Sequence, residues 1–462
     1  MQVNADLHAH SGYAGGVGKI SLAKIDEMMS LKGIDVIGTG DCLHPQWMEV
    51  LKENVKEIED GIFSFEERET KFVLQTEVII TSKIEKGRKS VHTVVLFPSF
   101  DAIERVCKVM ENWGVKNTIG RPFIVCEDKN DVSQRLCTMR DIDSKIEIIP
   151  AHVLTPDGIY GSKRPITYLN EFFGEYSREI SAIETGLSAD PGLLELIPEL
   201  QDRTWISNSD AHSHHLHRMG REFTTFEMRK MDYSHLVEAI RKNNVVRTAE
   251  FHPAEGRYFL TGHRGNRKGH NGSYCFYSPE YVPENHKCPI CSKKLTIGVL
   301  ERALILQKEQ SSKAEGMRRI AENINIKRNR KKKRNFVNMI PLAEIVARSL
   351  GIKSLTAKKV LKGYKKIVDL VGSECDLWFM DETELADILR NSIDQDILKA
   401  LLHVKRGEFG FYPPGYDGEY GNLNIGKLVD IIDTEKVFHS QNDGSNSLPD
   451  YGVNSFENSG LY

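Results

Sequence analysis

Short apolar runs alternate with amphipathic segments along the first half of the chain. One helix is predicted between Ser21 and Gly33, because apolar side chains recur there at helical spacing and glycine is a common C-terminal cap. A second helix is predicted after Asp101, ending at Gly114. Two apolar runs flank the polar residues 85–89, which indicates a β-hairpin. About seven strands separated by helices are typical of an α/β fold, and a barrel is favoured over an open sheet.

The hydrophobic pattern becomes helical again between residues 342 and 406. The last two helices, separated by residues 390–392, could form a helix-hairpin-helix-like pair that grips phosphates, or a plain bundle that braces the barrel. The bundle is favoured, because no Gly-x-Gly hairpin is visible at the junction. A glycine-rich segment then displays two tyrosines, Tyr416 and Tyr420.

Composition narrows the class of protein. Hydrophobic residues at 40% and charged residues at 27% are ordinary for a globular protein, and no apolar run approaches the roughly 18 residues that span a bilayer. No secretory signal is visible, so a cytoplasmic location and free thiols are expected. A net charge of −3 hides a basic run that includes Lys331, Lys332, Lys333 and Arg334. This run could be a solvated linker or an arm that binds phosphates.

Metal-binding side chains recur where the predicted strands end. In a barrel of parallel strands these ends converge on one face, so the side chains are expected to meet. Histidine nitrogens and carboxylate oxygens suit zinc, manganese or iron, and a carboxylate such as Glu77 or Asp210 can bridge two ions. His44 could be a further ligand or a loop residue. The eight predicted ligands are His8, His10, Asp41, Glu77, His92, His152, Asp210 and His212.

The order of these motifs resembles the PHP superfamily of phosphoesterases, and the longer words resemble its endonuclease Q family. The similarity runs from Asp6 to about Ile425. The words that carry it are Gly38-Thr39-Gly40-Asp41, Pro150-Ala151-His152, Glu184-Thr185-Gly186-Leu187-Ser188-Ala189-Asp190-Pro191, Ser207-Asn208-Ser209-Asp210-Ala211-His212, Gly220-Arg221-Glu222, Cys288-Pro289-Ile290-Cys291 and Pro414-Gly415-Tyr416-Asp417-Gly418-Glu419-Tyr420-Gly421.

The resemblance implies a distorted (β/α)7 barrel that holds two or three divalent ions, zinc, manganese or magnesium. It also implies incision of DNA 5′ of deaminated bases (hypoxanthine, uracil and xanthine) and of abasic sites. Asp210, Glu77 and His152 would serve catalysis through the metals, and Arg221 would steady a phosphate. Tyr416 or Tyr420 would stack on a flipped base. A monomer is expected, and a sliding clamp is a possible partner.

A second metal site is predicted after the barrel. Cys288 and Cys291 have the spacing of a zinc knuckle, and Cys275 supplies a third thiolate. The resemblance offers His263 as the fourth ligand of a structural zinc, and His270 and His286 remain alternatives.

The chain therefore divides into five predicted segments: a barrel at 1–248, a zinc-binding module at 249–300, a helix and basic linker at 301–340, a helical domain at 341–425, and a tail at 426–462 that is predicted to be disordered. Two other functions are considered. A phosphoesterase for a small phosphate ester does not explain the zinc module and the basic run. A non-enzymatic DNA-binding adaptor does not explain eight competent ligand positions.

Overall fold

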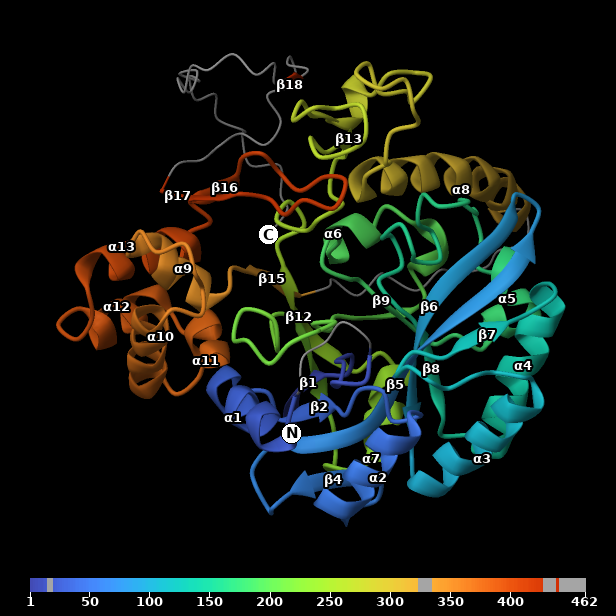
Figure 1. Cartoon of the computed structure of the whole chain (residues 1–462), viewed down its shortest axis with the longest axis horizontal. Helices are drawn as coiled ribbons and strands as arrows, with labels where there is room; N and C mark the ends of the chain where they lie inside the picture. The colour runs from blue at the N-terminus through green and yellow to red at the C-terminus, as the bar shows by residue number, and fades with distance from the viewer. Residues whose placement is uncertain (15–19, 323–334, 427–437, 440–462) are drawn as a thin grey trace.

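A mixed β-sheet forms the centre of the computed structural model, which describes residues 1–14, 20–322, 335–426 and 438–439 (Figure 1). The sheet has 11 strands, and its middle follows the order β11 (Phe223–Glu227), β1 (Gln2–Asp6), β2 (Val36–Gly38) and β5 (Lys71–Ile84). The other strands are β3 (Val55–Glu59), β4 (Ile62–Phe65), β6 (Gly87–Phe97), β7 (Phe123–Val125), β8 (Glu147–Pro150), β12 (Val245–Phe251) and β15 (Phe336–Met339).

Strand direction explains why the sheet is mixed. β1, β2 and β5 are parallel, whereas β11 pairs with β1, and β6 with β5 and β8, in the antiparallel sense. β9 (Ala182–Glu184) and β10 (Thr204–Ile206) form a separate parallel pair. The α/β class is confirmed, and closure of all these strands into a (β/α)7 barrel stays a prediction.

The helix ends and the hairpin turn lie close to the positions that the sequence predicts. In α1 (Leu22–Lys32) the Ser21 hydroxyl accepts from the Lys24 amide, and Gly33 ends the helix at a φ of 77°. α3 (Phe100–Asn112) begins at a Ser99 cap, two residues before the predicted start. The β5–β6 hairpin is confirmed, with Ile84 paired to Gly87 across its turn. The other helices here are α2 (Pro45–Asn54), α4 (Lys129–Ile142), α5 (Asn170–Phe173), α6 (Pro191–Leu194), α7 (Tyr233–Arg241) and α8 (Val299–Glu322), with short 3-10 turns at Gly174–Arg178, Pro198–Leu200 and Pro279–Tyr281.

The segment 301–340, predicted as a helix and a basic linker, contains the helix and also a strand that was not predicted. α8 occupies its start, and β15 at its end adds to the main sheet in parallel with β12. Apolar residues of this strand, among them Met339 at 2% exposure, give it a buried surface that a linker would not need. The basic residues 331–334 lie outside the described part of the chain, as does the tail apart from residues 438–439.

The C-terminal helices form a group beside α1 (Figure 1). They are α9 (Leu342–Ser349), α10 (Lys358–Val371), α11 (Glu374–Phe379), α12 (Glu382–Leu389) and α13 (Gln395–Lys405). The hairpin of β16 (Phe409–Phe411) and β17 (Leu423–Ile425) follows them and lies between this group and the module around β13 (Thr261–His263) and β14 (Cys275–Tyr277), to which β18 (Phe438–His439) pairs. No helix of the described residues is long and apolar enough to cross a membrane.

A buried ion pair attaches the helical group to the sheet domain. Lys32 Nζ at the end of α1 lies 2.7 Å from Glu374 Oε2 at the start of α11, and both side chains are 1% exposed. The same carboxylate accepts hydrogen bonds from the Leu342 amide at 2.9 Å and the Tyr364 hydroxyl at 2.6 Å. At Gly33 a Cβ atom would overlap the Ser373 side chain, so glycine both caps α1 and allows close approach. These contacts agree with the bracing role of the bundle.

Lys32→Met is expected to lower the free energy of unfolding by about 3 kcal/mol, because it leaves the Glu374 charge buried without its partner. The matched control is Lys24→Met in the same helix, whose ion pair with Glu27 has side chains 39% and 42% exposed. That control is expected to cost less than about 1 kcal/mol. Urea unfolding followed by circular dichroism measures both, and equal effects would contradict a buried brace.

Candidate metal centre

Six of the predicted ligands meet at one end of the sheet. Two groups have donor atoms that lie within 4.8 Å of one another: His8, His10 and Asp210, and Glu77, His92 and His152. They come from the segments after β1, β8 and β10 and from the β5–β6 hairpin. The residues come together as expected, but only His8, His10, His152 and Asp210 follow strand ends, whereas Glu77 and His92 lie within β5 and β6.

Glu77 links the two groups. Its Oε1 lies 2.6 Å from His92 Nδ1 and 3.4 Å from His152 Nε2. Its Oε2 lies 3.5 Å from His10 Nε2, and Oε1 is 3.8 Å from His8 Nε2. With the Glu77 side chain 1% exposed, this one carboxylate faces four imidazoles away from solvent. A carboxylate in this position could bridge two ions.

The donor set fits cations. His8 Nε2 and Glu77 Oε2 are buried and have no hydrogen-bond partner among the described residues. Buried polar atoms are rarely left without a partner, so each points to a missing contact. Imidazole nitrogen and carboxylate oxygen are ligands of zinc and manganese. The groups could therefore hold divalent ions.

Carboxylates behind His8 and His10, which follow β1, fix their rings. Glu184 lies 3.0 Å from His8 Nδ1 and accepts from the His152 amide at 2.9 Å. Asp41 Oδ1 lies 3.2 Å from His10 Nδ1, while its Oδ2 accepts from the Ser11 amide at 2.7 Å. Metal-ligating histidines commonly donate their second N–H to a carboxylate in this manner, which aims the free nitrogen at the metal.

The backbone is strained where the ligands are presented. Asp41, His152 and Asp210 have positive φ angles of 45°, 30° and 45°. Such conformations cost non-glycine residues free energy and concentrate at functional sites. Gly186 accepts the resulting close packing, since a Cβ there would overlap His152.

Charge distribution in the cluster favours protonated histidines when ions are absent. Burial by itself would lower the pKa of His8, but nearby carboxylates, Glu184 foremost, raise it to about 10. Burial likewise opposes protonation of His10, whose bonds to Asp210 and Asp41 raise its pKa to about 9. Burial would raise the pKa of Asp210, but the charge of His8 and the hydrogen bond from His10 hold it well below its usual range.

Three other predicted positions lie at the edge of the groups. Asp41 contacts His10 and Ser11 and is not in either group of donor atoms. His212 is 42% exposed and its ring lies 4.3 Å from that of His10, so it borders the first group. His44 packs its ring 4.6 Å from Tyr13, which agrees with a loop role.

Two functional candidates were missed by the sequence reasoning. Glu184 was noted only as part of a resemblance word, although its position directly at the end of a strand was the same signal that identified the ligands. Arg121 Nη1 lies 3.7 Å from Glu77 Oε2, and its Nε is buried without a partner among the described residues. No local pattern marks Arg121, because a loop brings it to the cluster.

The second predicted metal site also assembles. Donor atoms of His263, His270, Cys288 and Cys291 lie within 4.8 Å of one another. His263 Nε2 donates to the Lys294 carbonyl at 2.8 Å, and His270 Nδ1 donates to the Ser273 carbonyl at 2.8 Å. Each ring therefore turns its other nitrogen to a cysteine sulfur, as in structural zinc sites.

The structure separates the remaining zinc candidates. Cys275 Sγ lies 3.7 Å from Cys288 Sγ but outside the group of four, and burial together with that neighbour raises the pKa of its thiol to about 12. His286 Nε2 instead pairs with Glu301 at 2.7 Å. The geometry thus favours His270 over His286, and it places Cys275 beside the group.

The zinc-site module holds the glycine-rich segment. Asp417 Oδ2 accepts from the Arg264 amide at 2.9 Å and from Arg267 Nε at 2.5 Å, and Oδ1 accepts from Thr296 at 2.6 Å. Tyr416 is 5% exposed and packs its ring 5.0 Å from Phe276, so it has no free face for a base. The stacking role predicted for Tyr416 is therefore wrong.

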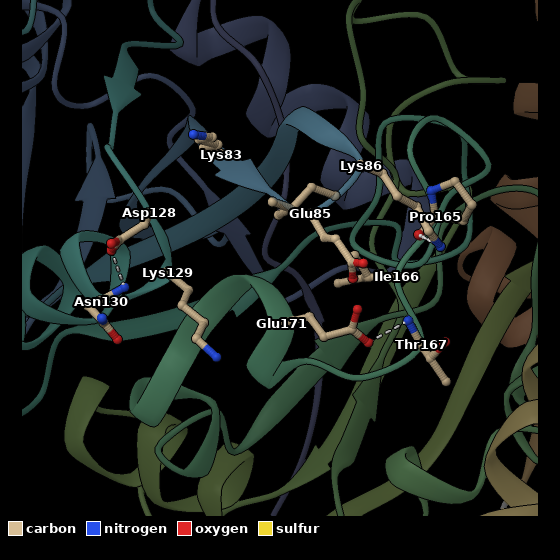
Figure 2. Close-up of a pocket in the computed structure, with 11 residues that line it drawn as sticks. Lys83, Glu85, Lys86, Asp128, Lys129, Asn130, Pro165, Ile166, Thr167 and Glu171 are labelled. Atoms are coloured by element: carbon tan, nitrogen blue, oxygen red, sulfur yellow. Dashed lines mark hydrogen bonds between the residues drawn. The ribbon is translucent and has the colours of Figure 1, made fainter.

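A polar pocket of about 640 Å³ lies at the tip of the β5–β6 hairpin (Figure 2). Lys86 Nζ donates to the Pro165 carbonyl at 2.8 Å, and Glu171 accepts from the Thr167 amide at 2.8 Å. Its lining contains no imidazole or thiol, so it is separate from both metal-site candidates.

Metal binding at the two groups around Glu77 is expected to release protons. At neutral pH both His8, with a pKa of about 10, and His10, with a pKa of about 9, are protonated without metal and must lose a proton to coordinate it. Apparent affinity for Mn²⁺ or Zn²⁺ should therefore rise with pH from about 7 to 9. Calorimetry in buffers of different ionisation enthalpy measures the protons, and binding without release would contradict these protonation states.

Zinc content should distinguish the ligands of the second site. His270→Ala is expected to lose the tightly held zinc, because it opens a closed four-ligand site. Cys275→Ser and the control His286→Ala should keep it. Elemental analysis of the purified variants measures the ratio of zinc to protein. Retention by His270→Ala with loss in Cys275→Ser would reverse the assignment.

Two curated proteins match parts of this chain. No protein-family model matches the chain. An uncharacterised protein of Methanocaldococcus jannaschii is 27% identical over 291 residues, which are 61% of this chain and 33% of that protein. The uncharacterised protein YqxK of Bacillus subtilis is 26% identical over 280 residues, 56% of this chain and 68% of its own length. This chain thus spans about a third of the archaeal relative.

Solved structures match nearly the whole chain. The lesion-specific endonuclease PfuEndoQ from Pyrococcus furiosus is 27% identical, with a TM-score of 0.73 over 92% of this chain and 96% of that one. Endonuclease Q in complex with a 27-mer duplex substrate that carries an abasic lesion at the active site is 26% identical, with a TM-score of 0.74 over 92% and 97% of the two chains. Over nearly its whole length, the chain is therefore similar to the endonuclease Q family.

Proposed function

We propose that this chain is a metal-dependent DNA endonuclease that hydrolyses the phosphodiester 5′ of a damaged nucleotide. Hypoxanthine, uracil and xanthine bases and abasic sites are the proposed lesions. The observation that carries the proposal is the pair of histidine–carboxylate groups joined by the buried Glu77. Similarity over 92% of this chain to an endonuclease Q bound to an abasic duplex supports DNA as the substrate.

The two groups would hold the divalent ions, zinc, manganese or magnesium, with Glu77 between them. Bound there, such ions activate a water molecule and neutralise charge on the scissile phosphate, so that no serine or cysteine nucleophile is needed. A third ion would find its ligands at the edge of the first group, where His212 lies 4.3 Å from His10, ring to ring.

The chain's own residues would prepare the site for the phosphate. Glu184 and Asp41 hold the rings of His8 and His10 in place, which keeps their free nitrogens aimed at the ions. Arg121, whose Nη1 lies 3.7 Å from Glu77 and whose Nη2 donates to the Ala14 carbonyl at 3.3 Å, would bring a positive charge to a phosphate oxygen at the site. Arg221 is only 4% exposed and donates to the Ser209 carbonyl at 3.2 Å. Its proposed role is to support the Asp210 loop.

Recognition of a lesion within a duplex would require the nucleotide to leave the base stack. The zinc-site module and the glycine-rich segment lie together, so one structural zinc would hold a DNA-facing surface in shape. The basic residues 331–334 remain a proposed phosphate-binding arm.

Asp210→Ala is expected to slow incision of a duplex with one abasic site by about 100-fold or more, since even loss of an outer-shell partner of a metal ligand costs 10–100-fold. The fold should persist, because Asp210 belongs to no hydrophobic cluster. Asp202→Ala, an exposed carboxylate before β10, is the matched control. Single-turnover cleavage of end-labelled DNA with Mn²⁺ or Zn²⁺ measures the rates.

Near wild-type incision by metal-saturated Asp210→Ala would contradict the assignment of the centre. Parallel duplexes with deoxyuridine or deoxyinosine test the other lesions. Wild-type hydrolysis of p-nitrophenyl phosphate without any cleavage of DNA would favour the small phosphate ester instead.

A further inference from the structure

Three arginines gather around one tyrosine beside the metal-centre loop. Arg218 Nη1 donates to the Tyr420 hydroxyl at 2.6 Å, and its guanidinium carbon lies 5.0 Å from the Tyr420 ring centroid. Arg257 approaches the same ring at 5.5 Å. Arg221 is buried, with its guanidinium 5.4 Å from the Phe251 ring, and its charge also acts on the Tyr420 hydroxyl. We name Arg218, Arg221, Arg257 and Tyr420 the arginine–tyrosine cluster.

The positive charge of this cluster has no carboxylate at ion-pair distance among the described residues, and only Arg221 interacts at longer range with the buried Glu222 and Glu255. None of its three guanidinium groups forms an ion pair with a carboxylate among the described residues, and Nη1 of the buried Arg221 has no hydrogen-bond partner there. Arg267 provides the contrast, because Asp417 neutralises it with two bonds. Holding three like charges close together opposes folding, so their convergence indicates an anionic ligand.

The lowered pKa of Tyr420 is consistent with the positive charge of the cluster. Burial would raise the pKa of the Tyr420 hydroxyl, but the charges of Arg221 and Arg218 outweigh it and lower the pKa below its ordinary value. Tyr420 is 37% exposed and Arg257 is exposed as well, so a ligand in solvent can reach the cluster.

Its position relates the cluster to the metal centre. Arg218 and Arg221 follow Asp210 in the same loop, and Arg221 Nε donates to the carbonyl of Ser209, the residue before Asp210. Tyr420 and Arg257 are joined through Gly418, whose carbonyl accepts from Arg257 Nε at 2.7 Å. Arg257 and Tyr420, which are distant from this loop in the sequence, therefore supply the other half of a cationic surface next to the candidate active site.

We propose that Arg218, Arg257 and Tyr420, supported from below by Arg221, bind a backbone phosphate of the DNA strand adjacent to the one held at the metal centre. Planar guanidinium groups suit phosphate oxygens, and a phenol hydroxyl adds a donor. The contact would fix the strand without reading its bases. This inference rests on the proposed nuclease function, which supplies the ligand.

The test is a salt titration of binding to an undamaged duplex, with the full chain. Arg218→Gln combined with Arg257→Gln should lower the slope of log affinity against log salt by about 0.9, the value for one lost phosphate contact. The control removes two charges elsewhere, Arg178→Gln with Arg229→Gln, whose side chains are 80% and 82% exposed. The control slope should equal that of the wild type.

A charge-preserving pair separates electrostatics from folding. Arg218→Lys with Arg257→Lys should retain the wild-type slope, since the phosphate stays neutralised. An unchanged slope in the Gln pair, or the same loss in the Lys pair, would overturn the inference.

Incision of the abasic duplex is measured in parallel. The Gln pair should need more DNA for half-maximal incision and keep a rate at saturation within about threefold of wild type, because this contact is made before and during cleavage. If wild-type protein binds duplex DNA but does not cut, the nuclease proposal fails while the slopes still decide the phosphate site. If it does not bind DNA, both fail.

Discussion

A single buried carboxylate, Glu77, governs the arrangement of the metal centre. Its side chain is 1% exposed, and its oxygens face imidazoles that arrive from three other segments of the chain. A charge in this position is costly unless opposite charge surrounds it. Protons on the histidines provide that balance without metal, and divalent ions would provide it when bound. Glu77 and His92 lie within the β5–β6 hairpin, and His8, His10 and His152 reach the same carboxylate from segments that follow β1 and β8.

The residues around Glu77 combine strained backbone conformations with hydrogen bonds that stabilise them. His152 and Asp210 adopt left-handed backbone conformations, which cost a non-glycine residue free energy. Glu184 offsets part of that cost, since it binds the His152 amide and the His8 ring together, and Asn208 donates to it at 2.8 Å. The result is a preorganised set of nitrogens and oxygens, which catalysis by metal ions requires.

Two further polar contacts attach the surrounding domains. The Lys32–Glu374 pair fixes the helical group to α1, and Asp417 fixes the glycine-rich segment to the zinc-site module through Arg267. Both contacts join segments far apart in the sequence. Tyr420, in the glycine-rich segment, lies beside Arg218. Arg218 belongs to the same loop as Asp210 of the candidate metal centre.

Local patterns allowed much of this to be predicted. The caps at Ser21 and Gly33 and the turn of the β5–β6 hairpin depend on neighbouring residues alone, and all are confirmed. The ligands were found because each ends an apolar run.

The remaining features depend on long-range contacts that a sequence does not display. β15 is a strand because β12 offers it an edge, and Tyr416 is buried because Phe276 covers it. The same holds for His270, which turns to Cys288 at 3.4 Å although the sequence left it as one of three alternative ligands. Asp41 was predicted as a ligand from its place in the sequence, but its side chain turns to Ser11 and His10.

The central claim is that Glu77 joins two metal-binding groups. X-ray anomalous scattering from crystals of the Mn²⁺- or Zn²⁺-loaded protein tests it most directly. We predict one peak among His8, His10 and Asp210 and another among His92, His152 and Glu77, with the Glu77 carboxylate in contact with both. Loaded crystals with no anomalous peak at these residues, or with a single ion that Glu77 does not touch, would contradict the account.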